Sequence, residues 1–349
     1  IFGGMKSVLY TSVLQTPILL LGSLIILVLG FKELGGWDEM MRVCGAVTVN
    51  DYGDTMTNLI RSNDDANFPW LGALIGSAII GFWYWCTDQF IVQRVLSGKN
   101  EMEARRGTIF GAYLKLLPVF LFLIPGMIAF ALHQKYIGAG GEGFLPMLAN
   151  GTANADAAFP TLVAKLLPAG VKGLVVCGIL AALMSSLASL FNSSAMLFTI
   201  DFYKRFKPET PEKKLVGIGQ IATIVIVVLG ILWIPIMRSV GDVLYTYLQD
   251  VQSVLAPGIA AAFLLGICWK RTSAQGGMWG LISGMVIGLT RLGAKVYYSN
   301  AGEVADSTFK YLFYDMNWLF FCGWMFLFCI IVVIVVSLAT EAPTAEKIQ

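Results

Sequence analysis

The chain has 349 residues, of which 57% are hydrophobic and only 13% are charged. Soluble domains carry fewer apolar and more charged residues, so this composition excludes an ordinary soluble protein and predicts an integral membrane protein in contact with a lipid bilayer. The formal net charge is +2 at pH 7. Because no long basic block interrupts the sequence, this balance excludes nucleic acid as a partner.

Apolar segments long enough to cross a bilayer follow one another along the chain. A spanning helix needs about 20 mostly apolar residues, and eight segments meet this need, at about 7–31, 69–86, 108–132, 173–200, 215–237, 243–269, 276–292 and 318–338. We therefore predict an all-α membrane protein with about eight transmembrane helices. Because the chain opens on Ile1 and the first apolar segment follows almost at once, we expect an internal to C-terminal fragment of a longer protein.

Basic residues gather in every second connection between these segments. They lie at about 94–106, 204–214 and 270–271, whereas the long connections at about 32–68 and 133–172 hold few of them and several carboxylates. Lysine and arginine mark cytoplasmic loops, so the long connections are predicted to face outward. The alternation predicts a multi-pass protein of the cell membrane, whether a plasma membrane or a bacterial inner membrane.

The second apolar segment ends in WYWCTDQFIVQR, residues 83–94. Its aromatic residues either anchor the helix at the edge of the bilayer or close over a ring-shaped ligand. Asp88 stands four residues after Tyr84, so we expect both on one helical face. Asp88 is then either a boundary charge in solvent or part of that ligand-facing surface.

The third apolar segment contains a lysine and two prolines. Lys115 stands seven residues into the segment, about 10 Å from its start at helical rise. Its side chain either reaches back to the cytoplasmic interface or faces a water-filled site. Pro118 and Pro125 interrupt the same segment, as Pro257 interrupts the sixth, and such breaks favour a helix that lines a cavity.

Two further segments carry polar residues in a helical pattern. In the fourth, Ala182, Ser185, Ser186 and Ser189 recur at i, i+3, i+4 and i+7, which places small side chains and hydroxyls on one face. That face serves either close helix packing or a small hard cation, which prefers oxygen ligands. In the sixth, three polar residues, Gln249, Asp250 and Gln252, favour a ligand-facing patch.

Several long motifs resemble the sodium/solute symporter family, and within it the sodium/glucose cotransporter branch. They run in the same order over nearly the whole chain: GGMKS, WYWCTDQFIVQR, GAYLKLLP, SSLASLFNSS with TIDFYKR, LAPGIAAAFLLGICWKR and GGMWGLISG. The pattern G-x4-R-x4-G of the family's second signature is matched from Gly266 through Arg271 to Gly276. One departure is Gly277, which stands where that signature has alanine.

The resemblance implies a LeuT-like core of two inverted repeats, with the solute near the membrane midplane. Residues 1–349 would form one transporter domain, with the last helix of the first repeat at about 7–31, the second repeat at about 69–269 and peripheral helices at about 276–338. In the family's sodium site, the matching positions are Ala182, through its backbone carbonyl, and Ser185 and Ser186, through their hydroxyls.

The resemblance also assigns the solute site and its gates. Tyr84 matches the inner-gate tyrosine that stacks on a sugar ring, with Trp85 beside it, and Tyr245 matches the outer-gate aromatic. Lys115 and Gln249 match residues that hydrogen-bond sugar hydroxyls.

Two of these family positions hold a different residue here. Gly81 lies where relatives place a threonine or asparagine against the sugar, and Ser12 lies where they commonly have an aspartate. The first departure affects the choice of solute. The second predicts one transported sodium ion rather than two.

The resemblance therefore predicts sodium-coupled symport of a hexose such as glucose or galactose by alternating access, with sodium as the only cofactor. The alternatives are a symporter of myo-inositol, another polyol or another small solute, and a transporter-like sugar sensor. An enzyme is not expected, because His133 is the only histidine and neither HExxH nor GxSxG occurs. The sequence does not indicate which oligomeric state the protein has.

Overall fold

A computed structural model describes residues 4–148, 151–240, 244–300 and 305–344. Most of these residues are helical, and the only β-pairing among them consists of two isolated bridges, Thr48 with Thr55 and Met147 with Ala153. The helices form two compact units, each described here by itself. The single transporter domain stays a prediction.

The first unit contains the long helices that include the predicted sodium ligands. Its elements are α1 (Gly4–Leu34), α2 (Trp37–Gly45), α5 (Glu101–Leu114), η1 (Val119–Leu123), α6 (Ile124–Gly138), η2 (Ala155–Ala157), α7 (Ala158–Leu166), α8 (Ala169–Met196), η3 (Leu197–Tyr203), α9 (Lys204–Phe206) and α10 (Glu212–Val240), the last as far as Ile234. Of these, η1 and η3 are π-helical and η2 is a 3₁₀ turn.

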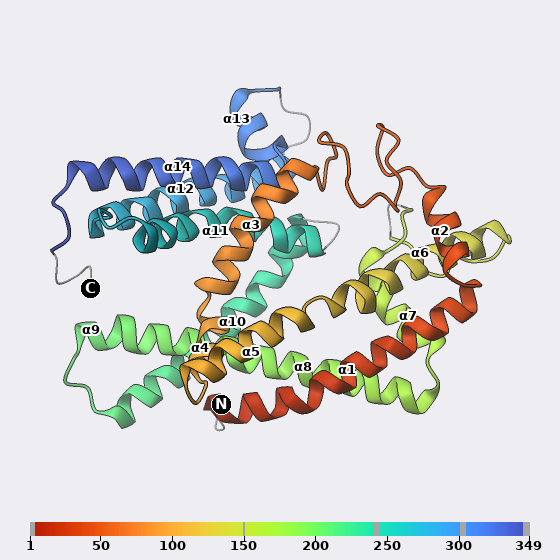
Figure 1. Cartoon of the computed structure of the whole chain (residues 1–349), viewed down its shortest axis with the longest axis horizontal. Coiled ribbons are helices and arrows are strands. Elements are labelled where there is room, and N and C mark those ends of the chain that lie inside the picture. Colours follow the sequence, from red (N-terminus) through yellow and green to blue (C-terminus); the bar gives the residue numbers. More distant parts are fainter. Residues whose placement is uncertain (1–3, 149–150, 241–243, 301–304, 345–349) are drawn as a thin grey trace. The chain divides into compact units, whose positions relative to one another are not determined.

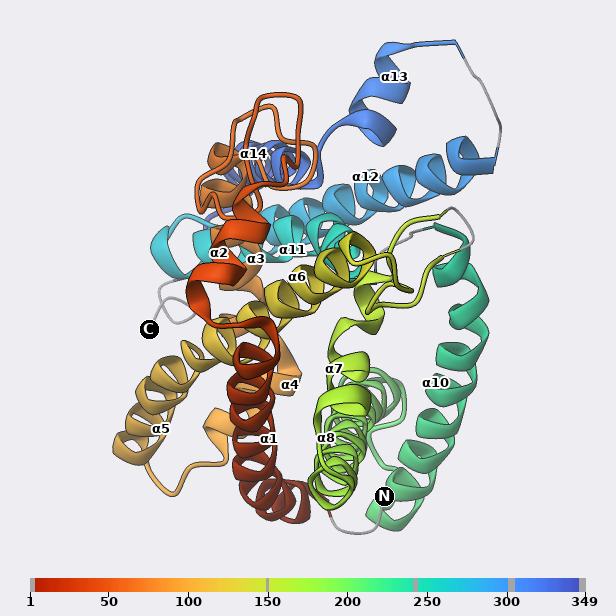
Figure 2. The same ribbon diagram turned by 90° about the vertical axis from the view of Figure 1, so that its right-hand side faces the viewer.

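Helix α1 lies along α8 in this unit (Figure 2). A small residue permits the close approach, since a Cβ on Gly178 of α8 would lie 3.0 Å from the side chain of Ile18 on α1. A core of fully buried residues joins α1 to α6 and α7, with Leu34, Ile128 and Leu162 each at 0 to 1% exposure. The pair α1–α8 is thereby fixed at the place where the predicted sodium ligands lie.

The second unit contains the remaining spans. Its elements are α3 (Trp70–Cys86), α4 (Gln89–Leu96, as far as Arg94), α11 (Leu244–Cys268), α12 (Ala274–Asn300), α13 (Thr308–Lys310), η4 (Tyr311–Asp315) and α14 (Trp318–Ala339). Helices α11, α12 and α14 lie side by side, and α3 packs against α11 and α14 (Figure 1).

Glycines let the helices of the second unit approach closely. A Cβ on Gly284 of α12 would lie 3.0 Å from the Cα of Gly258 on α11, and a Cβ on Gly76 of α3 would lie 2.9 Å from the carbonyl oxygen of Leu319 on α14. Backbone meets backbone at these points, so a larger residue has no room unless a helix moves.

The predicted all-α membrane fold is confirmed, and most of the eight predicted spans pass a test of length and apolar character in the described residues. Six helical stretches are long and apolar enough to cross a membrane, or seven if α3 and α4, which are bent by 48° at their junction, count as one span. Helix α3 alone has 17 residues, fewer than a span needs. Helix α12 has 27 residues, but its glycines and the charges of Arg291 and Lys295 make it too polar to qualify.

The observed helices otherwise follow the predicted segments closely. The third segment is a bent stretch in which α5, η1 and α6 follow one another, and the fourth ends in the π-helical η3. The two π-helical segments of the first unit, η1 and η3, lie inside apolar spans, where such irregular turns are frequent at functional positions. The predicted start of the sixth segment, residue 243, lies outside the described residues.

Candidate functional site

Two aromatic residues close the end of α3. Tyr84 is half-buried, Trp85 is 45% exposed, and their ring centroids lie 5.5 Å apart with the planes at 87°. The helix ends one residue later, at Cys86, and Thr87 at its C-cap donates to the carbonyl oxygen of Trp83 through its backbone nitrogen at 3.0 Å and its Oγ1 at 2.7 Å. The two rings therefore present perpendicular planes, which suits the C–H surface of a ring-shaped solute.

The prediction that Asp88 shares a helical face with Tyr84 is wrong. Helix α3 ends at Cys86, so Asp88 lies in the break before α4. Its Oδ1 accepts a hydrogen bond from the backbone nitrogen of Phe90 at 2.9 Å, and its carbonyl oxygen accepts from that of Val92 at 2.9 Å. Asp88 starts α4 as its N-terminal cap and has a structural role there.

Gly81 lies one turn before the aromatic pair, on the same helix. A Cβ at this position would meet no atom within 4 Å among the described residues. A threonine or asparagine would fit this space sterically. The space beside Gly81 is therefore consistent with its predicted place beside the solute, which stays a prediction.

The first half of α11 has two different faces. Tyr245 is 58% exposed and Gln249, one turn later, is half-buried, whereas Tyr247 and Asp250 are 6% and 8% exposed. At 3.6 residues per turn these pairs lie on different sides of the helix. The predicted polar patch is therefore divided: Gln249 shares a face with Tyr245, while Asp250 points into the packing with α12.

Lys115 belongs to the first unit and lies where α5 ends. Helix α5 begins at Glu101, so Lys115 follows a helix of 14 residues and the predicted position seven residues into the helix is wrong. The helix starts earlier because Asn100 caps it by accepting from the backbone nitrogen of Glu103 at 2.9 Å. Lys115 is exposed, and its role as a solute ligand stays a prediction.

The hydroxyl face of α8 meets α1. The Oγ of Ser185, which is 8% exposed, lies 2.9 Å from the Oγ of Ser12 on α1. Ala182 is half-buried one turn earlier, and Ser186 is exposed. The oxygens of these residues, hydroxyl and carbonyl, are the ligand type that a hard cation such as sodium takes. The structure thus brings Ser12 against Ser185, one of the predicted sodium ligands.

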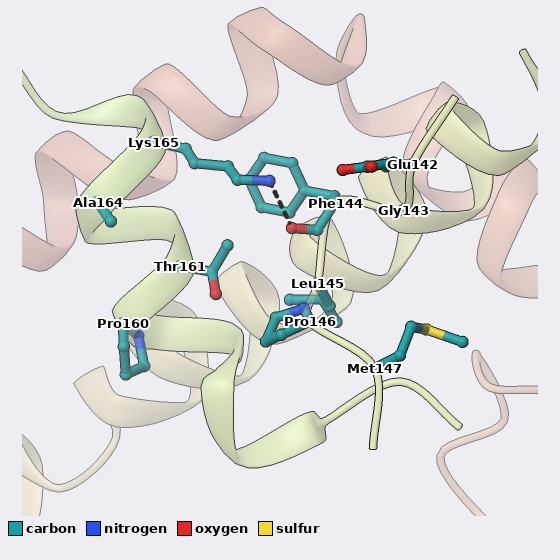
Figure 3. Close-up of a pocket in the computed structure, with 10 residues that line it drawn as sticks. All are labelled: Glu142, Gly143, Phe144, Leu145, Pro146, Met147, Pro160, Thr161, Ala164 and Lys165. Carbon is teal, nitrogen blue, oxygen red and sulfur yellow. Dashed lines mark hydrogen bonds between the residues drawn. The ribbon is translucent and has the colours of Figure 1, made fainter. Parts of the chain in front are cut away.

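A hollow of about 670 Å³ in the first unit lies away from the predicted residues (Figure 3). Its walls include Phe144, Thr161 and Lys165, whose Nζ donates to the carbonyl oxygen of Phe144 at 2.8 Å. Nearby, His133 is 3% exposed and its Nδ1 accepts from the backbone nitrogen of Leu145 at 3.0 Å. These contacts hold the chain after α6, so the lysine and the histidine have structural roles.

Two charged residues of α12 were missed by sequence reasoning. Arg291 is fully buried and Lys295 is partly exposed, and both approach Asp250. The seventh predicted segment, 276–292, contained Arg291 near its end and stopped before Lys295, and neither residue was singled out. Their spacing of four residues, which places two cations on one helical face, was the available signal.

A bundle of apolar helices that carries hydroxyl, amide and aromatic side chains within its spans has the features of a membrane transporter. The family model described as "SSF: Sodium:solute symporter family" matches residues 1–284. The chain belongs to the sodium:solute symporter family.

Three similar proteins align with almost the entire chain. The sodium/myo-inositol cotransporter 2 of Homo sapiens is 35% identical over 358 residues, which cover 99% of this chain and 53% of that protein. The sodium/mannose cotransporter SLC5A10 of Bos taurus is 36% identical over 360 residues, covering 100% and 60%. The sodium/glucose cotransporter 1 of Ovis aries is 37% identical over 362 residues, covering 99% and 54%. The chain spans a little over half the length of these relatives.

Family membership settles several predictions. The predicted family is confirmed, and so is a multi-pass protein of the membrane. The family and these relatives are sodium-coupled transporters rather than enzymes, which agrees with the expectation of no enzyme and with sodium as the coupled ion. The relatives themselves are named for myo-inositol, mannose and glucose.

Proposed function

We propose that the full-length protein couples the inward movement of sodium to the uptake of a neutral sugar, with a hexose as the first candidate. The observation that carries this proposal is the division of α11. Its only carboxylate in the first half, Asp250, points toward Lys295 and Arg291, so the opposite face offers the neutral side chains of Tyr245 and Gln249. Neutral amide and aromatic groups suit a solute that carries hydroxyls and no charge.

The proposed solute contacts divide by chemistry. Tyr84 stacks on the ring of the sugar, because an aromatic plane covers C–H groups without needing donors. Gln249 both donates and accepts, and Lys115 donates, to hydroxyls. Trp85 and Tyr245 close the site toward its two sides in the inward and outward gates of an alternating-access cycle.

The proposed sodium site links the fourth span to the first. Ser185 and Ser186 supply hydroxyl oxygens, and Ala182 a carbonyl oxygen, to the transported ion. The 2.9 Å contact between Ser185 and Ser12 supports this arrangement, because it brings a further hydroxyl to the same place. When sodium leaves, the two serines satisfy each other, so the emptied site costs little.

The test is a sodium-gradient uptake assay of the full-length protein in proteoliposomes. An inward sodium gradient should accelerate hexose accumulation well above an equal potassium gradient. Tyr84→Phe should retain most of the affinity, whereas Tyr84→Ala should lose about 1 to 2 kcal/mol of it, the scale of one lost aromatic contact. Equal uptake in sodium and potassium would contradict the proposal, and unchanged affinity in Tyr84→Ala would return Tyr84 to the role of an interfacial anchor.

The second candidate solute is myo-inositol or another polyol. The open space beside Gly81 favours this second candidate, because relatives are expected to hold a polar side chain against the sugar at that position and this chain does not. One similar protein is also named for myo-inositol. A panel of glucose, galactose, mannose and myo-inositol compares the candidates directly. Binding of a sugar without any sodium-driven uptake would instead indicate the sensor alternative.

The ion stoichiometry follows from Ser12. A carboxylate at this position would add a full negative charge beside the serines, whereas a hydroxyl adds only a dipole, a difference of several kcal/mol for a partly dehydrated cation. We therefore expect one sodium ion per solute. The reversal potential of solute-coupled current at several sodium gradients measures it, and two ions per solute would refute the argument from Ser12.

A further inference from the structure

A buried ion cluster joins α11 to α12. Asp250 of α11 accepts at both carboxylate oxygens: Lys295 Nζ lies 2.5 Å from Oδ2 and Arg291 Nη2 lies 3.5 Å from Oδ1. Asp250 is 8% exposed and Arg291 is 0% exposed. Charges are this deeply buried only where they are paired, so the three side chains form one unit that is sensitive to the loss of any member.

Arg291 extends this cluster to the rest of the second unit. Its Nη2 also donates to the carbonyl oxygen of Met316 at 2.8 Å, and its guanidinium carbon lies 4.0 Å from the ring centroid of Phe321 on α14. The planar guanidinium can make these contacts together because its donors point in fixed directions. One side chain thereby connects α11, the chain before α14, and α14 itself.

The first half of α11 needs such an attachment. Pro257 inside the helix has no backbone N–H, so the carbonyl of Ser253 loses its helical donor at this point. Just beyond the proline, Gly258 packs against Gly284, where a Cβ on Gly284 would lie 3.0 Å away. One turn before the proline the backbone meets α12 again, since a Cβ on Gly288 would lie 2.7 Å from the carbonyl oxygen of Val254. The backbone is thus fixed around the proline, while the turns from Leu244 to Ser253 depend on side chains for their orientation.

We propose that Asp250, Arg291 and Lys295 form a clamp that sets the rotation of the first half of α11 about its own axis. Tyr245 and Gln249 project from a different side of that half-helix, so the clamp holds them in the direction from which they meet a ligand. The three charged residues are positioning residues and do not touch the solute. The part that concerns a sugar rests on the proposed function, whereas the rotation of α11 does not.

The rotation can be measured through the reactivity of single introduced cysteines. Tyr245→Cys and Tyr247→Cys are introduced separately into the full-length protein. The protein without either change gives the background reaction of its native thiols. A small charged methanethiosulfonate reagent is applied to the protein in detergent. Tyr245 is 58% exposed and Tyr247 is 6% exposed, so the first position should react about tenfold faster or more.

The clamp is then broken by Asp250→Asn and, in separate proteins, by Lys295→Met. Asp250→Asn should reduce the ratio of the two reaction rates to about threefold or less, because the half-helix is free to turn, and Lys295→Met should reduce it by a smaller factor. The double variant should show no larger change than Asp250→Asn alone, since that change already removes the ion pair with Lys295. Lys295 is the more exposed partner, and the Asp250–Arg291 contact remains when Lys295 is changed. Lys295→Met is therefore the variant to measure if Asp250→Asn does not fold.

A matched control is Asp306→Asn, which removes an exposed carboxylate paired with Lys310 in the same unit. Its reaction ratio should equal that of the unchanged protein. A ratio unchanged by both Asp250→Asn and Lys295→Met would overturn the clamp, and so would purely additive effects of the two changes.

A second readout connects the clamp to transport. In the sodium-driven uptake assay, Lys295→Met should raise the KM for sugar about fivefold and keep the maximal rate per folded transporter. If Lys295 had only a structural role, Lys295→Met would lower the maximal rate and leave KM unchanged. That result would contradict a positioning role. Absence of sodium-driven sugar uptake in the unchanged protein would refute the proposed function, while the cysteine ratio would still decide the clamp.

Discussion

Helices α8 and α11 each bury polar side chains inside a span, but they satisfy them in different ways. On α8 the hydroxyls of Ser189 and Ser193 donate to carbonyl oxygens one turn earlier, at 3.1 and 2.8 Å, and Ser185 contacts Ser12 on another helix. On α11, Asp250 has two cations of α12 as its charge partners among the described residues.

The difference shows how far the polar side chains of each helix are required to hold the fold together. A hydroxyl that bonds to its own helix stays satisfied when a neighbouring helix moves or an ion arrives. A buried carboxylate cannot lose its partners without leaving a charge unpaired. We infer that α8 can exchange its polar contacts during a transport cycle, whereas α11 and α12 move as one body.

The largest expected effect comes from removing the carboxylate of the ion cluster. Asp250→Leu leaves Arg291 and Lys295 facing each other without an anion, and should cost about 3 to 5 kcal/mol of the free energy of unfolding. Chemical denaturation of the purified full-length protein measures this. Asp306→Asn, in an exposed pair, should leave the unfolding curve unchanged, and an equal loss in both variants would remove the distinction between buried and exposed charges.

A smaller effect tests whether α11 and α12 are fixed by contact as well as by charge. Gly284→Ala puts a methyl group 3.0 Å from the Cα of Gly258, and should destabilise the protein by about 1 to 3 kcal/mol. Gly293→Ala lies on the same helix with no atom within 4 Å, so it should be neutral or slightly stabilising. Thermal unfolding compares the two, and equal behaviour would show that the helices adjust freely.

On α8, removing one polar side-chain group should lower the stability of the protein only slightly but should impair sodium-driven transport strongly. Ser185→Ala removes the contact with Ser12 and should cost only about 0.6 kcal/mol, the average for a hydrogen bond between membrane helices. The sodium concentration for half-maximal uptake should rise about tenfold with the loss of one ligand. Ser189→Ala, whose hydroxyl bonds to its own helix, should leave sodium activation unchanged. If both variants lose sodium activation equally, the ligand assignment fails.

The smallest expected effect concerns a carboxylate in the loop before α3. Burial raises the pKa of Asp65, but hydrogen bonds from the backbone nitrogens of Phe68 and Asn67, at 2.7 and 2.9 Å, outweigh it and hold the pKa below its ordinary value. Because the folded pKa is lowered, this stabilisation is complete above the ordinary carboxyl pKa and is lost as the pH falls through the lowered one. Hydrogen exchange of Asn67 and Phe68 should therefore accelerate only in strong acid.

Asp65→Asn is the control for that measurement. It cannot titrate, so the acid-dependent acceleration should disappear. Acceleration that begins already near neutral pH in the unchanged protein would contradict the lowered pKa.

The apolar segments were predictable because length and hydropathy alone define a spanning helix. Helix α14 was expected at 318–338 and is found at Trp318–Ala339, since nothing polar interrupts it. Lys115 was misplaced within its helix because the first turns of α5 are polar and owe their helical form to the cap at Asn100. Asp88 was placed on the face of α3 because the sequence shows no break after Cys86, where the chain leaves α3 before it begins α4 at Gln89.

The candidate site was predictable only in part, for a related reason. Helical spacing placed Ser185 and Ser189 on one face of α8, where both are buried, whereas Ser186 is exposed, and the contact between Ser12 and Ser185 could not be read from spacing within one helix. Spacing could not tell which of Gln249 and Asp250 faces a ligand. That choice depends on Arg291, some forty residues later in the chain, and pairing between helices leaves no mark in a local pattern.

The polarity of α12 has a consequence for how the protein is made. An arginine or lysine near the centre of a spanning helix costs about 2.5 to 3.5 kcal/mol during insertion from the translocon. Helix α12 carries Arg291 and Lys295 among many glycines and falls short of the apolar character of its neighbours. Asp250 precedes both cations in synthesis by roughly the length of one hairpin, so α11 is already present when α12 emerges. We expect the two helices to enter the bilayer as a pair, and glycosylation mapping of the nascent chain with Asp250→Leu should show α12 inserting less efficiently.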